Sequence, residues 1–174
     1  NIEKQISMMI VDDDPAVLKA TSLIFGESGY LVATCANARE ALAELQKNQF
    51  DVVLSDISMP EMTGIDLLEK IHAFNKEIPV ILMTGYAELN MAVEAIKKGA
   101  ADFILKPYDP AYLTHSVKKA VDYYRLIQME KNYKFRLEKD IKKRTQELAE
   151  ALSTVKSMNT EVVHRLTVVS EYRD

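Results

Sequence analysis

Short apolar segments alternate with segments of helical periodicity over the first 127 residues, and this alternation restricts the fold more than any other feature. The expected strands are Ser7–Val11, Leu31–Cys35, Val52–Ser55, Pro79–Met83 and Phe103–Leu105. The expected helices begin at Pro15, Ala38, Thr63, Leu89 and Pro110. A chain in which each strand is followed by a helix favours a parallel sheet with helices on both faces. The sequence therefore predicts an α/β fold whose functional crevice lies at the carboxyl ends of the strands.

Polar residues with related chemistry follow four of the expected strands. They are Asp12, Asp13 and Asp14 after the first strand, Asp56 after the third, Thr84 after the fourth and Lys106 after the fifth. Any one of them could be a solvated strand end, but the set suits a single reaction. Neighbouring carboxylates repel one another unless a cation lies between them, and oxygen ligands favour Mg²⁺. A carboxylate can attack phosphorus, while an ammonium and a hydroxyl stabilise the phosphoryl oxygens. The set therefore predicts phosphorylation of a carboxylate.

Four segments around these residues resemble a known family. They read MIVDDDP over Met9–Pro15, LSDISMP over Leu54–Pro60, ILMTG over Ile81–Gly85 and FILKP over Phe103–Pro107. In order and spacing they are similar to the receiver domains of bacterial two-component response regulators, over roughly residues 6–127. The resemblance implies a flavodoxin-like, doubly wound sheet of five parallel strands in the order 2-1-3-4-5.

The resemblance also implies a role for each residue at the strand ends. Asp56 would accept the phosphoryl group; Asp12, Asp13, Asp56 and the backbone carbonyl of Ser58 would hold Mg²⁺; Thr84 and Lys106 would contact the phosphoryl group; Thr84 and Phe103 would form the switch. The implied phosphoryl donor is a sensor histidine kinase. The family often has tyrosine where this chain has Phe103, so any function of that hydroxyl is lost here. We also expect Tyr86 to shield the phosphoryl group from water.

After Pro110 the sequence contains neither proline nor glycine, so a helix can continue to the end of the chain. We expect a receiver domain over residues 1–123 and a helical linker over residues 124–174. In the linker, residues recur with the a and d spacing of a coiled coil over about four heptads. The expected coiled-coil core is Ile141, Leu148, Leu152, Val155, Asn159, Val162, Leu166 and Val169. Asn159 would fix the register at some cost in stability. A helix that packs on another domain of a longer protein is the alternative.

Charge is divided unevenly between these two parts. Residues 1–123 carry a net charge of −7 and residues 124–174 a net charge of +3, within a total of −4. An acidic domain binds nucleic acid poorly because phosphate contacts dominate that affinity, so we expect no direct nucleic-acid partner. No apolar stretch reaches the about 18 residues that suggest a membrane span, and no secretion leader is evident. Cys35 is the single cysteine. These features predict a cytoplasmic protein.

The output of the switch is open to several interpretations. Residues 161–174 resemble the helix that leads into HD-GYP domains, the cyclic di-GMP phosphodiesterases, but the His-Asp pair and Gly-Tyr-Pro triplet of that family are absent from this chain. The receiver segments are also similar to those of activators of nitrogen-regulatory type, which carry an ATPase. A passive dimerisation scaffold that no longer takes phosphate is the third interpretation. We expect no enzymatic activity, and a homodimer through the C-terminal helix, with the fourth helix, fifth strand and fifth helix as a second candidate face.

Overall fold

The structure is a computed structural model that describes residues 5–85 and 89–171 of the chain. Two compact units make up the chain, and the first ends at Gln128. The second unit begins at Met129, so the boundary lies inside a helix that starts at Pro110 and ends at Glu171. The boundary that we expected after residue 123 falls in the same helix.

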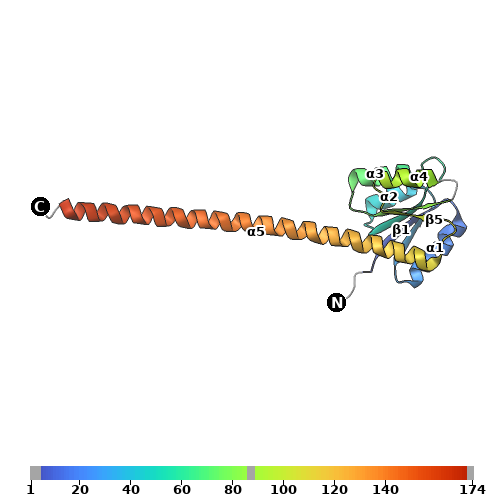
Figure 1. Ribbon diagram of the computed structural model, residues 1–174, viewed down its shortest axis with the longest axis horizontal. Coiled ribbons are helices and arrows are strands. Elements are labelled where there is room, and N and C mark those ends of the chain that lie inside the picture. Colours follow the sequence, from blue (N-terminus) through green and yellow to red (C-terminus); the bar gives the residue numbers. More distant parts are fainter. Residues whose placement is uncertain (1–4, 86–88, 172–174) are drawn as a thin grey trace. The chain divides into compact units, whose positions relative to one another are not determined.

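The first unit alternates strands and helices along its whole length (Figure 1). Its strands are β1 (Ser7–Val11), β2 (Leu31–Cys35), β3 (Val52–Asp56), β4 (Val80–Thr84) and β5 (Asp102–Leu105). The helices are α1 (Pro15–Glu27), α2 (Ala38–Lys47), α3 (Gly64–Phe74), α4 (Leu89–Lys97) and α5 (Pro110–Glu171), which continues into the second unit. The bounds of the strands and the first residues of the helices differ from the expected ones by at most one residue.

The strands form one sheet in the order β2-β1-β3-β4-β5, and every neighbouring pair is parallel. This order confirms the predicted doubly wound, flavodoxin-like fold. The order of the strands reverses between β1 and β3, because the chain first moves outward to β2 and then crosses back over β1. In sheets of this kind the ligand crevice lies outside the carboxyl ends of the strands at that reversal. Asp12 and Asp56 lie at the strand ends beside this reversal.

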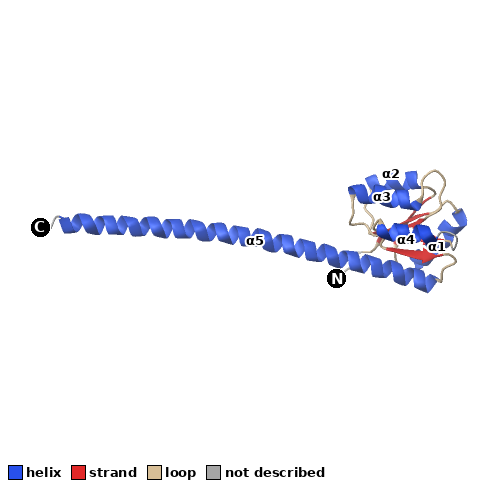
Figure 2. Ribbon diagram, turned by 45° about the horizontal axis from the view of Figure 1, so that its top comes forward, coloured by secondary structure: helices blue, strands red, loops and turns tan. Residues whose placement is uncertain are grey.

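Helices cover the sheet on both faces (Figure 2). One apolar cluster joins the sheet to α2, α3 and α4, and a second joins it to α1 and the first part of α5. The strand β1 contributes to both, since Met9 and Val11 belong to the first cluster and Met8 and Ile10 to the second. Successive side chains of a strand point to opposite faces, so a central strand must be apolar along its length to be covered in this way.

Two helices that begin beside the strand ends have starts encoded in the sequence. Asp14 is the N-cap of α1 and accepts a hydrogen bond of 2.8 Å from the backbone N–H of Ala16, with Pro15 at the first helical position. At α3, Thr63 and Asp66 form a capping box in which each side chain accepts a hydrogen bond from the other residue's backbone N–H. These caps fix where the chain turns after β1 and β3.

The second unit consists of the part of α5 that begins at Met129. All described side chains from Met129 to Ser170 are exposed. This includes the apolar residues expected in the coiled-coil core, whose exposed fractions are 63% for Ile141, 64% for Leu148, 67% for Leu152, 55% for Val155, 55% for Val162 and 66% for Leu166. The side chain of Val169 lies outside the described residues. Among the helices that the structure describes, none is both long and apolar enough to cross a membrane.

Candidate functional site

The site is formed where four neighbouring strands end. Asp12 directly follows β1, Asp56 is the last residue of β3, Thr84 is the last residue of β4, and Lys106 directly follows β5. Because β1, β3, β4 and β5 are adjacent and parallel, their carboxyl ends meet at one edge of the sheet. The sheet therefore gathers residues that are up to 94 positions apart in the sequence.

The ammonium group of Lys106 binds two buried carboxylates at this edge. Its Nζ lies 2.8 Å from Oδ2 of Asp12 and 2.5 Å from Oδ1 of Asp56. The exposed fractions of Asp12 and Asp56 are only 1% and 7%. Buried charges persist in proteins when they are paired, so the ammonium explains how two carboxylates can face each other here. One ammonium does not balance the charge of two carboxylates, so the site can accept a further cation.

The charges of this group affect one another's pKa values. Burial raises the pKa of the Asp56 carboxyl, and the negative charge of Asp12 adds to this, while Lys106 and the backbone N–H of Ser58 oppose it. For Lys106, burial lowers the pKa, but its hydrogen bonds to Asp12 and Asp56 outweigh burial and the pKa is raised. The lysine is therefore held in its charged form, and a further cation beside Asp56 would act against the rise in the pKa of its carboxyl.

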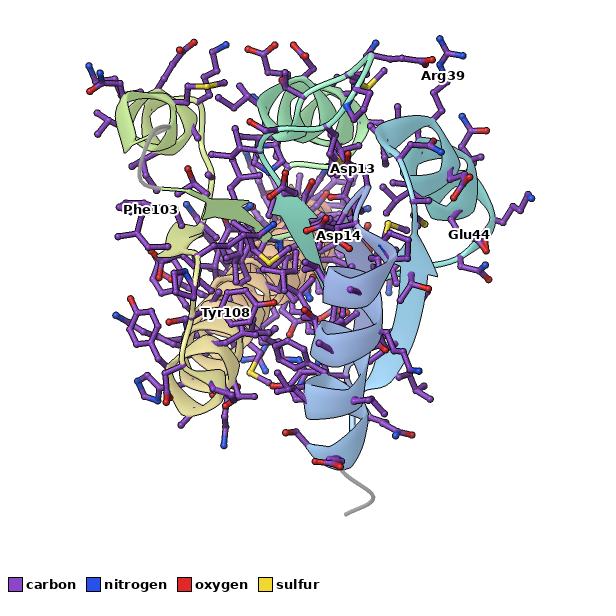
Figure 3. The ribbon with its side chains drawn as sticks, turned by 90° about the vertical axis from the view of Figure 1, so that its right-hand side faces the viewer. Asp13, Asp14, Arg39, Glu44, Phe103 and Tyr108 are labelled. Atoms are coloured by element: carbon purple, nitrogen blue, oxygen red, sulfur yellow. The ribbon has the colours of Figure 1, made fainter. Side chains whose placement is uncertain are left out.

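The remaining acidic residues after β1 differ in their surroundings. The backbone N–H of Asp14 donates to Oδ1 of Asp12 at 2.9 Å, which helps to orient that carboxylate. The side chain of Asp14 caps α1, and Asp13 is exposed. Both residues lie at the start of α1 (Figure 3). After the neighbouring strand β3, the backbone N–H of Ser58 donates to Oδ2 of Asp56 at 2.9 Å.

These residues fit a magnesium ion. In the described part of the chain, no three His, Cys, Asp or Glu side chains are already gathered as metal ligands. Mg²⁺ does not require such a cage, because it commonly binds one or two carboxylates and keeps several water molecules. Asp12 and Asp56 present oxygen atoms to the same point, and that point is now occupied by a lysine ammonium. A donor set made only of oxygen atoms, with a deficit of positive charge, suits this ion.

The two expected switch residues lie on neighbouring strands. Thr84 is completely buried, and its hydroxyl donates to the carbonyl of Gly85 at 3.2 Å. Phe103 on β5 is half-buried and packs against the apolar cluster of α2, α3 and α4 (Figure 3). Tyr86, which we expected to shield the phosphoryl group, lies outside the described residues.

Sequence reasoning missed two features of this region. A Cβ atom added to Gly64 would lie 2.2 Å from the carbonyl oxygen of Asp56, so only glycine allows α3 to start this close to β3. A glycine directly after a helix-capping threonine could have suggested such an approach. The second feature is a hydrogen bond of 2.7 Å between the hydroxyls of Thr21 and Tyr108. No pattern in the sequence predicts it, because it depends on how α1 packs against a distant loop.

Comparison with known proteins agrees with this geometry. The family model of the response regulator receiver domain matches residues 8–118. The transcriptional regulatory protein ZraR of Klebsiella oxytoca is 39% identical over 123 residues, which are 71% of this chain and 28% of that protein. The C4-dicarboxylate transport transcriptional regulatory protein DctD of Rhizobium meliloti (strain 1021) is 40% identical over 121 residues, 70% of this chain and 26% of that protein. The chain thus spans roughly a quarter of the length of these curated relatives.

Solved structures show the same likeness. A CheY-like response regulator receiver domain protein from Methanospirillum hungatei JF-1 is 37% identical, with a TM-score of 0.67, and the match covers 70% of this chain and 98% of that one. NtrX from Brucella abortus, crystallised in complex with ADP, is 28% identical, with a TM-score of 0.70, over 72% of this chain and 29% of that one. Receiver domains take phosphoryl groups from sensor histidine kinases and bind Mg²⁺ at the phosphorylation site. Because the family match covers more than half of its residues, this chain belongs to the response regulator receiver domain family.

Proposed function

We propose that this chain is a cytoplasmic, phosphorylation-activated switch of a two-component system in which Asp56 accepts a phosphoryl group from a sensor histidine kinase. The observation that carries the proposal is the Lys106 ammonium bound to the buried carboxylates of Asp12 and Asp56. A structural ion pair would need only one carboxylate. A second buried carboxylate at the same ammonium is explained if a cation and a phosphoryl group are to be accommodated beside it.

The proposed reaction is a transfer between a histidine and a carboxylate. An oxygen of Asp56 forms a bond to phosphorus as the bond from phosphorus to the histidine nitrogen breaks, and the nitrogen keeps the electron pair. Lys106 stabilises the charge on the transferred oxygens. Asp12, Asp13, Asp56 and the carbonyl of Ser58 would hold Mg²⁺, which would supply further charge neutralisation. Because Asp56 is already fixed by the Ser58 N–H, little reorientation is required.

The proposed switch couples this reaction to the surface formed by α4, β5 and the first part of α5. A phosphoryl group on Asp56 offers acceptor oxygens to the hydroxyl of Thr84, which now donates to the carbonyl of Gly85. Movement of that hydroxyl changes the packing next to Phe103, which is only half-buried and can become more buried. The helix α4, the strand β5 and the first part of α5 would then present a changed surface. Phosphorylation acts in this way as a charge that biases a two-state element.

The second unit is proposed to form a coiled coil with a second copy of the chain. Its a and d residues, such as Leu152 and Val155, are exposed in a single chain. Helices in water owe most of their stability to tertiary packing of an apolar face, so this unit requires a partner. A second copy presents the same seam in the same register, and it pairs Asn159 with Asn159, which satisfies both amides when the helices are parallel. The alternative is that this helix packs on another domain of a longer protein.

The decisive experiment is intact mass spectrometry after incubation with acetyl phosphate and Mg²⁺, on this chain and on Asp56→Asn. We expect a gain of about 80 Da, one phosphoryl group, in the parent alone. Light scattering of both proteins, with and without acetyl phosphate, reports whether the dimer is constitutive or depends on phosphate. A folded parent that gains no mass in the presence of Mg²⁺ would contradict the switch and favour the passive dimerisation scaffold.

A second candidate concerns the protein to which this receiver belongs. Both curated relatives described above are transcriptional regulatory proteins, which favours a transcriptional activator over a cyclic di-GMP phosphodiesterase as the output. The similarity covers the receiver, so the output itself is a proposal. The reading frame that contains this segment decides between the two. A Gly-rich phosphate loop followed by Lys and Ser or Thr indicates the ATPase, and a His-Asp pair with Gly-Tyr-Pro indicates the phosphodiesterase.

A further inference from the structure

A neutral hydrogen bond joins α1 to the segment between β5 and α5. Thr21 on α1 is completely buried, and its Oγ1 lies 2.7 Å from the hydroxyl of Tyr108, which is 87 residues later in the chain. The ring of Tyr108 packs against the apolar cluster between the sheet, α1 and α5. Figure 3 shows Tyr108 beside the start of α5, on the same side of the sheet as α1. Packing of the ring and the hydrogen bond to Thr21 therefore hold the side chain of Tyr108 in place.

The two partners belong to the two segments that carry the reacting charges. Tyr108 lies two residues after Lys106. Thr21 lies on the helix that Asp14 caps, and the backbone N–H of Asp14 in turn holds the carboxylate of Asp12. The segment of Lys106 and the segment of Asp12 are thus connected twice, once by their ion pair of 2.8 Å and once by the hydroxyl pair.

The ion pair cannot remain unchanged during phosphoryl transfer. In the proposed reaction the ammonium of Lys106 has to turn from Asp12 and Asp56 towards the phosphoryl oxygens. This weakens the direct link between the two segments at the moment when the position of the ammonium matters most. The hydroxyl pair carries no charge and involves neither carboxylate, so it is unaffected by that exchange.

We propose that Tyr108 and Thr21 form a positioning pair, which holds the backbone of Lys106 in place while its ammonium moves from the carboxylates to the phosphoryl group. This inference rests on the proposed phosphorylation of Asp56. Neither residue touches the reacting atoms. Their effect is to keep the loop after β5 at a fixed distance from the acidic residues. The ammonium can then reach the phosphoryl oxygens without movement of the loop.

Substitutions that remove only the hydroxyls test this pair. Tyr108→Phe keeps the ring, Thr21→Val keeps the shape of the side chain, and Thr21→Ser keeps a hydroxyl as the matched control. The phosphorylation rate of the full chain by acetyl phosphate is measured by intact mass at a range of acetyl phosphate concentrations. We expect the maximal rate of Tyr108→Phe and of Thr21→Val to fall about tenfold. The half-saturating acetyl phosphate concentration and the Mg²⁺ affinity, measured by calorimetry, should stay at the parent values.

The double variant Tyr108→Phe, Thr21→Val separates positioning from stability. Replacing both partners of a buried hydrogen bond by apolar groups of the same shape can be nearly neutral for stability. A merely structural pair would therefore recover its urea midpoint and its phosphorylation rate together. For a positioning pair, we expect a urea midpoint close to the parent value and a rate as low as in either single variant. Thr21→Ser should keep the rate within about twofold of the parent.

Several outcomes would overturn the inference. They are a parent-like rate in Tyr108→Phe, a recovered rate in the double variant, or rates that fall only as the folded fraction falls. The parent protein distinguishes these outcomes from failure of the proposed function. If the parent gains no phosphoryl mass, the proposed phosphorylation of Asp56 fails, and the positioning pair fails with it. If the parent is phosphorylated and the variants match the parent, only the positioning pair is refuted.

Discussion

In the first unit the strands and helices bury their apolar residues against one another, whereas in the second unit the apolar residues of α5 are exposed. Ile10 and Leu54 are fully buried between the sheet and its helices, while Leu152 is 67% exposed. Burial of apolar surface is the dominant favourable contribution to folding. The first unit therefore contains the interactions that fold it, whereas the second unit would gain its apolar contacts only through the proposed association. The proposed dimer and the proposed phosphorylation site can thus be tested separately.

The largest expected effect is on association through the second unit. Leu152→Ala removes one apolar side chain from the proposed seam of each copy, and we expect the dissociation constant to rise about 100-fold or more. Sedimentation equilibrium measures this change. Ser157→Asp, at an exposed position off the seam, is the matched control and should leave association unchanged. If Leu152→Ala dimerises like the parent, the interface lies elsewhere on the chain.

The next effect concerns the close contact between α3 and β3 in the first unit. A Cβ at position 64 would meet the carbonyl oxygen of Asp56 at 2.2 Å, so the backbone must move apart in Gly64→Ala. We expect the free energy of unfolding to fall by about 2–3 kcal/mol in urea titrations followed by circular dichroism. Gly26→Ala is the control, because a Cβ there meets nothing within 4 Å, and alanine is the better helix former. Equal stability of Gly64→Ala and the parent would refute the steric argument.

A smaller effect is expected from the cap of α3, and it depends on pH. Hydrogen bonds from Thr63 hold the pKa of the Asp66 carboxyl below its usual range. The stabilisation is therefore present above the unfolded pKa of about 3.9 and is lost as the pH falls through the lowered folded value. Because Asp66 is exposed, Asp66→Asn should cost less than about 1 kcal/mol at pH 7. The difference in urea midpoint between variant and parent should shrink at pH 3; a constant difference would show that the charge is not involved.

The last prediction changes stability least, because it measures the reactivity of thiols. It compares a thiol in the interior of the first unit with one on the surface of the second. Cys35 is buried, and burial, together with the charges of Glu40 and Glu44, raises its pKa to about 11. We expect iodoacetamide to modify Cys35 hardly at all at pH 8, where the thiol is protonated and covered. A cysteine introduced by Ser157→Cys should react readily. Mass spectrometry of the alkylated protein reads both positions, and rapid reaction at Cys35 would indicate local opening of the sheet.

The sequence predicted the elements of the first unit almost without error, because each is short and has a strong local signal. Strands such as Val80–Thr84 are continuous apolar runs, and α1 begins at an Asp-Pro pair that both caps and starts a helix. The strand order followed from the family resemblance and is confirmed by the pairing of the strands. The residue roles in the site and the coiled coil of the second unit stay predictions.

The geometry of the site was only partly predictable. The order of polar residues after the strands placed Asp12, Asp56, Thr84 and Lys106 at one edge, since parallel strands share that edge. It did not predict that Asp13 would be exposed while Asp12 is buried, because the two adjacent residues differ only in the direction that the chain takes as it leaves β1.

By itself, the sequence determined the alternation of strands and helices, the chemistry available at the strand ends, and the apolar seam of α5. These are properties of residue type and spacing along the chain. Only the tertiary structure decided that Lys106 binds Asp12 and Asp56 together, that α3 approaches β3 at Gly64, and that Tyr108 meets Thr21. Each of these contacts joins segments that are distant in the sequence and meet only when the strands form one sheet and the helices pack on it, and their distances are set by the volumes of all the side chains between them.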